Sequence, residues 1–235
     1  MLQLLMPSRY YLRNFVPPYH YHIYNRGANK QNIFRDATDY TTFLDIIAFY
    51  LKFPNGRPFK YIEKLTNKAR FQVRNLEDVG NTSFSITCFC LMPNHFHFLI
   101  KQNRQANAGN SITNFMRRTM IAYSMYFNQR HDHSGTIFQG RYKNIVAKSD
   151  EQLLHLTKYI HNNPVEILES KKLSTYKYSS YPDYLGANNF PWTDKEEILK
   201  YFSQSIPNLN YQRFCEDGET TRDKIEAVAL DLPGS

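Results

Sequence analysis

The sequence predicts an α+β protein of the ferredoxin-like (split βαβ) type, with one antiparallel sheet and helices on one of its faces. Three observations lead to this prediction. Segments with strand and helix periodicity follow one another in the order β–α–β–β–α–β, the middle two strands are separated only by a short turn, and an additional helix follows the last strand. The other face of such a sheet is free to present polar groups.

The first strand is expected at residues 19–25, which alternate and are rich in Tyr and Ile. A helix is expected at residues 36–50, where hydrophobic residues recur at helical spacing after an expected cap at Thr38 and Asp39. Proline, asparagine and glycine at positions 54–58 then end the helical pattern.

The central hairpin is expected at residues 83–90 and 95–102, two hydrophobic segments joined by a turn at residues 91–94. Residues 111–130 carry hydrophobic side chains at helical spacing and predict the second helix. Residues 137–147 predict the fourth strand, which completes the sheet.

The additional helix begins after Ser149, a residue type that commonly caps a helix, and it carries Tyr159. We expect it to run to Asn163 and to end there, because the residue before Pro164 is disfavoured in the helical conformation.

The chain is long enough for one sizeable domain with additions. We expect an N-terminal extension at residues 1–18, the main domain at residues 19–170 and a C-terminal extension with an acidic tail at residues 171–235. A stretch rich in Lys and Arg at about residues 52–83 is expected to be an insertion in the main domain.

The charge is divided unevenly along the chain. Residues 1–160 carry 21 Lys and Arg against 9 Asp and Glu, whereas residues 161–235 carry 8 against 12. A basic body favours a polyanionic partner such as nucleic acid, and an acidic tail could cover the same surface. The 18 Tyr and 17 Phe suit base stacking along a single strand, although most of these rings are expected in the core.

The composition also excludes several classes of protein. No segment approaches the roughly 18 apolar residues of a membrane span, and the N-terminus lacks the pattern of a secretory signal. Three cysteines do not make a disulfide framework, so a reduced, cytoplasmic setting fits better.

His95 and His97 lie two residues apart on a predicted strand. Because side chains alternate along a strand, both imidazoles point to one face, where they can reach one divalent cation. The alternative is a pair of solvated surface histidines. Cys88 and Cys90 also share a face, but buried small side chains are favoured there over zinc ligands.

Tyr159 and Asn163 lie four residues apart on the additional helix, which places both side chains on one face. A hydroxyl and an amide oxygen are thereby presented together. Taken alone, the tyrosine would be a packing residue and the asparagine an ordinary helix end. The pair becomes informative only beside the two histidines.

Five segments of the chain resemble the REP-associated tyrosine transposases, a branch of the single-tyrosine HUH transposases. They are YHIYNRGANKQNIFRDATDYTTFL, LMPNHFHFLI, FQGRYK, YIHNNPV and SSYPDYLG. The resemblance covers about residues 19–51 and 84–186. The chain departs from the family pattern in a longer segment at residues 52–83 and in lacking the Arg-Ala-Gly that commonly follows Asn-Pro.

This resemblance implies His95, His97 and Asn163 as metal ligands and Tyr159 as the nucleophile of an enzyme that nicks and rejoins single-stranded DNA. The expected cofactor is Mg²⁺ or Mn²⁺, and the expected intermediate is a 5′-phosphotyrosine. A free tyrosine has a pKa of ~10 and is therefore a poor nucleophile at neutral pH. The metal would stabilise the transition state by drawing charge from the phosphate oxygens. The expected partner is single-stranded DNA with palindromic hairpins, bound by a monomer or a homodimer with no role for a membrane.

Basic residues in or near these segments are candidates for contacts to DNA phosphates, although any one of them could simply be a solvated side chain. They are Arg26, Arg117, Arg118, Arg141 and Lys143. His155 and His161 lie close to Tyr159 in sequence, with a surface position as the default for His155.

A second function is compatible with the same sheet and charge: a catalytically idle module that binds structured RNA or single-stranded DNA. The complete set of two histidines, tyrosine and asparagine argues against it, because a pure binding module has no need of metal ligands.

Overall fold

The computed structural model describes residues 14–54, 83–106, 111–169, 172–202 and 205–217. Most of the expected N-terminal extension and basic insertion, and the end of the acidic tail, lie outside these residues. Among the described helices, none is long and apolar enough to cross a membrane.

The described elements follow the predicted order. The strands are β1 (His20–Arg26), β2 (Phe84–Met92), β3 (His95–Gln102) and β4 (Lys143–Val146). The longer helices are α1 (Ala37–Lys52), α3 (Ile112–Arg130) and α4 (Asp150–Asn162). The C-terminal helices are α5 (Tyr181–Tyr184), α6 (Glu196–Leu199) and α7 (Pro207–Glu216), and 3₁₀ turns lie at Ala28–Lys30, Asn163–Glu166 and Leu173–Thr175.

The four strands form one sheet in the order β2-β3-β1-β4, and each neighbouring pair is antiparallel. β1 and β2, which α1 connects, therefore run in the same direction with β3 between them. This is the split βαβ arrangement, so the predicted ferredoxin-like α+β fold is confirmed.

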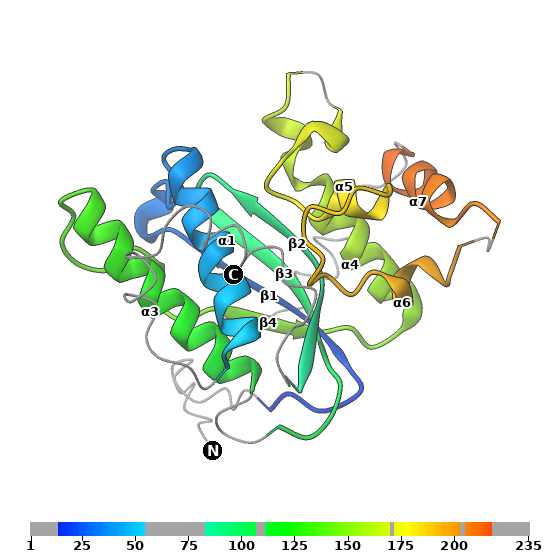
Figure 1. Cartoon of the computed structure of the whole chain (residues 1–235), viewed down its shortest axis with the longest axis horizontal. Helices are drawn as coiled ribbons and strands as arrows, with labels where there is room; N and C mark the ends of the chain where they lie inside the picture. The colour runs from blue at the N-terminus through cyan, green and yellow to red at the C-terminus, as the bar shows by residue number, and fades with distance from the viewer. Residues whose placement is uncertain (1–13, 55–82, 107–110, 170–171, 203–204, 218–235) are drawn as a thin grey trace, which may run out of the picture.

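Helices cover both faces of the sheet (Figure 1). α1 and α3 form one layer, and α4 lies on the opposite side together with α5, α6 and α7. The face that we expected to be free is thus covered. The reason lies in α4 itself, whose Leu153, Leu156 and Ile160 are buried against Cys90 and Leu99 of the sheet.

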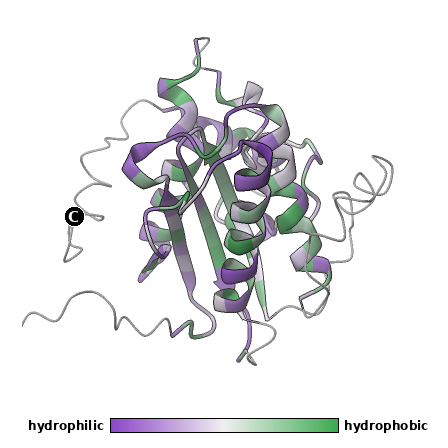
Figure 2. Ribbon diagram, turned by 90° about the vertical axis from the view of Figure 1, so that its left-hand side faces the viewer, coloured by the Kyte–Doolittle hydropathy of each residue, from purple (hydrophilic) through white to green (hydrophobic). Residues whose placement is uncertain are grey.

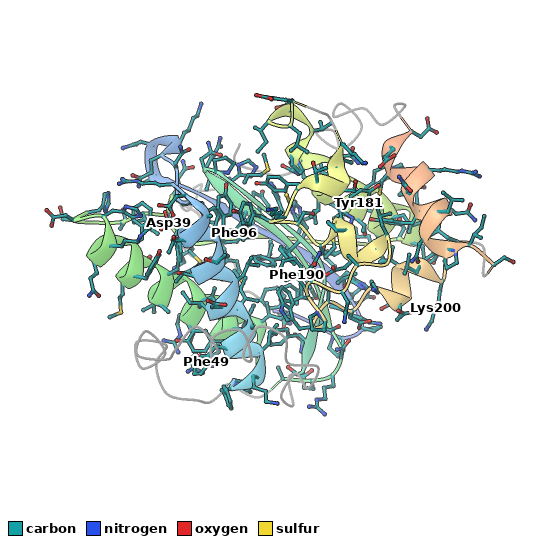
Figure 3. All side chains as sticks on the ribbon, turned by 45° about the horizontal axis from the view of Figure 1, so that its top comes forward. Asp39, Phe49, Phe96, Tyr181, Phe190 and Lys200 are labelled. Carbon is teal, nitrogen blue, oxygen red and sulfur yellow. The ribbon has the colours of Figure 1, made fainter. Side chains whose placement is uncertain are left out.

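The layer of α1 and α3 rests on an aromatic core. Ile23, Phe96 and Phe98 of the sheet are fully buried and belong to one cluster with Phe43 of α1 and Tyr123 of α3. Figure 3 shows Phe96 between the sheet and this layer, and Figure 2 shows hydrophobic residues concentrated where the sheet faces its helices. Burial of these side chains holds the first layer in place.

The C-terminal residues complete the second layer and cover the edge strand β2. The backbone N–H groups of Leu91 and Ser180 bond to the carbonyls of Tyr178 and Phe89, and Asp194 N–H bonds to the carbonyl of Ile86. Satisfying an exposed edge in this way removes a site at which other chains could pair. Figure 3 shows Tyr181 within this layer.

The predicted cap of α1 and the predicted extent of the fourth strand were wrong. The α1 helix is capped by Asp36, whose carboxylate accepts the N–H groups of Thr38 and Asp39 at 2.9 and 3.2 Å, so these two residues lie inside the first turn. The fourth strand is confined to β4, because Gly140 adopts a left-handed conformation with φ of 70° and interrupts the predicted strand.

The end of α4 also differs from the prediction. Asn163 keeps helical dihedral angles (φ −49°, ψ −41°), and the chain continues into a 3₁₀ turn that contains Pro164. The conformational restriction before proline is a preference, and it is overridden here. The helical conformation of Asn163 keeps its side chain above Tyr159 by one turn.

Candidate active site

Polar side chains gather on the face of the sheet that α4 covers. In the register of β1 and β3, Tyr24 lies opposite His97 and Arg26 lies opposite His95. Residues directly opposite each other in an antiparallel pair share a face, so the two histidines and these β1 side chains lie on the same side. Phe96 and Phe98, which alternate with the histidines, face the other layer.

α4 brings Tyr159 to this face. The Tyr159 ring packs edge-on against His97, with centroids 5.4 Å apart and an interplanar angle of 81°. It makes a similar contact with His22 of β1 at 6.0 Å and 79°. The contacts with the two imidazoles hold the Tyr159 ring in place. The side chain is half-buried, so part of it remains accessible to solvent.

The amide of Asn163 faces His95. Its Nδ2 donates to the Tyr159 carbonyl at 2.9 Å, and this fixes Oδ1 toward His95 Nε2, which is 3.2 Å away. His95 Nδ1 lies 2.6 Å from Oδ1 of Asn94, an acceptor, and therefore carries the ring proton. His95 Nε2 and Asn163 Oδ1 thus present two lone pairs to each other, an arrangement that a bound cation would satisfy.

The turn before His95 is tied to the end of β1. The Gly27 N–H donates to the Asn94 carbonyl at 2.8 Å, and Asn94 Nδ2 donates to the Lys30 carbonyl at 3.4 Å. A Cβ atom on Gly27 would collide with the carbonyl oxygen of Gln31, so the close approach requires glycine. These contacts hold Asn94, and through it the ring of His95.

His97 is buried and makes its hydrogen bond within the sheet. Its Nδ1 lies 2.8 Å from Nε2 of His22, and the two rings stack with centroids 5.0 Å apart. The His95 ring packs edge-on against His97 at 5.0 Å. Three imidazoles and one phenol therefore meet between β1, β3 and α4.

The environment keeps these imidazoles neutral. Burial lowers the pKa of His22 to about 3, and it lowers the pKa of His97 well below the usual value, with His22 and His95 adding to the effect. Burial and the nearby Arg26 lower the pKa of His95, whereas Asn163 Oδ1, which would accept a hydrogen bond from a protonated ring, raises it. Neutral imidazoles have the free lone pair that metal coordination requires.

Within the described residues, no cluster of three or more His, Cys, Asp and Glu side chains could hold a metal. The candidate set differs because its third donor is an amide oxygen. Cys88 and Cys90 are buried thiols whose pKa values are raised by burial, which fits the expectation that they pack as small side chains.

Three of the basic candidates lie at the site end of the sheet. Arg26 is the last residue of β1, and Lys143 lies opposite Tyr24 in the pairing of β1 with β4. Arg141 is exposed and follows Gln139, whose N–H bonds to the Arg26 carbonyl at 2.7 Å. They form a basic border beside Tyr24.

Arg117 and Arg118 do not reach the site, because α3 lies on the opposite face of the sheet (Figure 1). The Arg117 guanidinium bonds to Asn114 at 2.7 Å, and Arg118 lies 4.2 Å from the Tyr50 ring centroid of α1. Their spacing on an amphipathic helix gave no information about which layer that helix joins.

The two other histidines of α4 also lie apart from the tyrosine's neighbours. His155 is near Glu151, 3.8 Å away on the same helix. His161 is fully buried, with Nδ1 at 2.6 Å from the Tyr211 hydroxyl and Nε2 at 2.8 Å from Ser180 Oγ. It joins α4 to α5 and α7.

The sequence analysis missed His22 and Tyr24. The alternation of residues 19–25 already places His20, His22 and Tyr24 on one face. The sequence did not show that this strand pairs with β3, or in which register, so His22 and Tyr24 could not be placed beside His97.

Fold and geometry therefore define a ferredoxin-like α+β protein with a tyrosine, two histidines and an asparagine on one face of its sheet. Residues 60–163 match the family described as "Transposase IS200 like", a span that contains all four of these residues and a little under half of the chain. The predicted resemblance to single-tyrosine transposases is thereby confirmed.

Among solved structures, a REP-associated tyrosine transposase bound to a REP hairpin matches with a TM-score of 0.49 and 12% sequence identity. The match covers 79% of this chain and 90% of that chain. Curated proteins give no match.

Proposed function

We propose that this protein is a metal-dependent enzyme that nicks and rejoins single-stranded DNA beside hairpins, through a 5′-phosphotyrosine intermediate. The observation that carries the proposal is the meeting of Tyr159 with His97 and of Asn163 with His95 within a single chain. The transposase family match over the same residues supports it. The hairpin substrate rests on the sequence resemblance.

His95, His97 and Asn163 are the residues that would hold the metal. The convergent lone pairs of His95 and Asn163 fit a cation, and an incomplete set of imidazole and amide ligands leaves positions for phosphate oxygens. Mg²⁺ or Mn²⁺ suits such a set, whereas structural zinc favours four closed ligands. When bound, the cation acts as a Lewis acid on the scissile phosphate.

Tyr159 is the nucleophile in this proposal. Its phenolic oxygen forms a bond to phosphorus while the bond from phosphorus to the 3′-oxygen breaks. The phenolic proton passes to solvent, and the leaving 3′-oxygen takes up a proton. Attack by another 3′-hydroxyl reverses these changes, so rejoining needs no ATP.

Lys143, Arg26 and Arg141 would contact the DNA backbone beside the site. Phosphate contacts fix the position of a strand without selecting its sequence. The half-buried Tyr24 ring, between Lys143 and His97 in the sheet, offers a surface on which a base could stack.

The proposal is tested with a hairpin DNA that carries single-stranded flanks and a fluorescent label at its 3′ end. With Mn²⁺ present, we expect a labelled protein band in a denaturing gel, because the 5′-phosphate of the labelled fragment stays on the protein. Tyr159→Phe should form no adduct. Tyr201→Phe, which alters an exposed tyrosine outside the site, should behave as the wild type.

Equal adduct formation by the wild type and Tyr159→Phe would show that the nucleophile is wrongly assigned. Unchanged hairpin binding in EDTA, with no cleavage in Mn²⁺, would favour the idle binding module instead.

A further inference from the structure

The face that carries the proposed metal ligands contains a third buried histidine, His22 of β1. Its Nε2 lies 2.8 Å from His97 Nδ1, and its ring stacks on Tyr24 with centroids 4.9 Å apart. His22 is 4% exposed, so solvent does not compete for this hydrogen bond.

A comparison with His161 indicates that His22 is not placed there for stability. Both ring nitrogens of His161 have partners, Tyr211 and Ser180. His22 Nδ1 is buried and has no hydrogen-bond partner in the described part of the chain. An unsatisfied buried polar group costs about 1–3 kcal/mol, so this nitrogen does not stabilise the fold.

The hydrogen bond between the two histidines has a definite consequence for His97. A neutral imidazole carries one proton, and only its other nitrogen can bind a metal. If His22 Nε2 accepts, the proton of His97 lies on Nδ1 and Nε2 is left free as a ligand. If His22 donated instead, His97 Nε2 would carry the proton and could not coordinate.

We propose that His22 is a positioning residue that accepts the Nδ1 proton of His97 and so fixes the tautomer in which His97 Nε2 can bind the metal. The inference rests on the proposed function, because it assumes that His97 is a ligand. Asn94 plays the corresponding part for His95, whose Nδ1 is 2.6 Å from the Asn94 amide oxygen. Such partners of metal-bound histidines fix the ring orientation and raise metal affinity.

The test compares His22→Phe with His22→Gln in the full chain. Phenylalanine keeps a ring against Tyr24 but has no acceptor, whereas glutamine offers an amide oxygen near the position of Nε2. Binding of Mn²⁺ without DNA is measured by calorimetry, together with the melting temperature of the metal-free protein. His20→Phe is the matched control, because His20 is buried on the same face of β1 but lies beside Glu197.

We expect His22→Phe to weaken Mn²⁺ binding by about 10–100-fold. Its melting temperature should stay near the wild-type value, because the unsatisfied His22 Nδ1 is removed while His97 Nδ1 loses its partner. His22→Gln should recover most of the affinity, and His20→Phe should bind as the wild type does. Equal weakening by phenylalanine and glutamine would overturn the acceptor role.

Failure of this inference can be told apart from failure of the proposed function. If the wild type binds Mn²⁺ and forms the DNA adduct while His22→Phe binds equally tightly, only the role of His22 is wrong. If the wild type binds no Mn²⁺ and forms no adduct, the proposed function itself is wrong and the inference falls with it.

Discussion

The layer of α1 and α3 and the layer of α4 to α7 cover the same sheet, but they bury different side chains. Toward α1 and α3 the sheet presents Ile23, Phe96 and Phe98, which need only close packing. Toward α4 it presents His22 and His97 together with Leu99 and the cysteines. Each buried imidazole needs hydrogen-bond partners, so the second layer must place its groups more specifically.

Most polar groups of the second layer have found such partners. The hydroxyls of Tyr176 and Tyr184 bond to the carbonyls of Leu91 and Thr87 in β2, and His161 is satisfied on both sides. Around Tyr159 the pairing within the described residues is incomplete: the lone pairs of His95 Nε2 and Asn163 Oδ1 face each other, and His22 Nδ1 has no hydrogen-bond partner. The proposed chemistry thus lies among buried polar groups whose hydrogen bonding is incomplete in the described residues.

The largest effect expected from this contrast is on metal affinity. His95→Ala should reduce the affinity for Mn²⁺ by more than about 100-fold, because losing an outer-shell partner alone costs about 10–100-fold. Calorimetry on the metal-free full chain measures it. His155→Ala, on α4 but beside Glu151, is the control and should bind as the wild type does. Unchanged affinity in His95→Ala would remove His95 from the ligand set.

The first layer should respond in stability instead. Phe43 of α1 is fully buried against Phe96 and Phe98, so Phe43→Ala should lower the free energy of unfolding by about 3–5 kcal/mol. Urea unfolding measures this loss. In the folded variant, the Mn²⁺ affinity should stay at the wild-type value. A large change in affinity would mean that the two layers are not independent.

The sequence predicted the fold class and the order of strands and helices along the chain well, because strand alternation and helix periodicity directly report which side chains are buried. It also predicted that His95 and His97 share a face, since alternation is a local property. It could not predict that β1 lies beside β3 in the register that joins His22 to His97, nor which layer contains Arg117. These depend on contacts between residues far apart in the chain.

The second layer should also be sensitive to pH. Burial lowers the pKa of His161 to about 3, from 6.5 in the unfolded chain. Between pH 6.5 and 3, His161 is protonated in the unfolded chain but stays neutral in the folded chain. The stability that neutral His161 contributes is therefore complete above pH 6.5 and is lost as the pH falls toward 3, by up to about 1.4 kcal/mol per pH unit.

His161→Gln, which does not titrate, isolates this contribution. Between pH 6.5 and 5, the variant should lose less stability than the wild type, by up to about 2 kcal/mol in urea unfolding. Parallel pH profiles for the two proteins would show that His161 is not held neutral by its burial.

The smallest effect concerns DNA phosphates. Lys143→Ala should weaken binding to single-stranded DNA and reduce the slope of log affinity against log salt by about 0.7–1, the value for one lost phosphate contact. Arg117→Ala, on the opposite layer, should leave the slope unchanged. Fluorescence anisotropy at several salt concentrations measures both. Equal effects would place DNA on both faces of the molecule.

The central claim is that the sheet and the α4 helix of one chain together make a complete site, and a mixing experiment tests it most directly. Tyr159→Phe and His97→Ala are each expected to form no covalent adduct with the labelled hairpin DNA in Mn²⁺. Because each variant lacks one half of its own site, an equimolar mixture should also form none, whereas the wild type does. Recovery of the adduct in the mixture would contradict the account, since Tyr159 of one chain would then be working with the histidines of another.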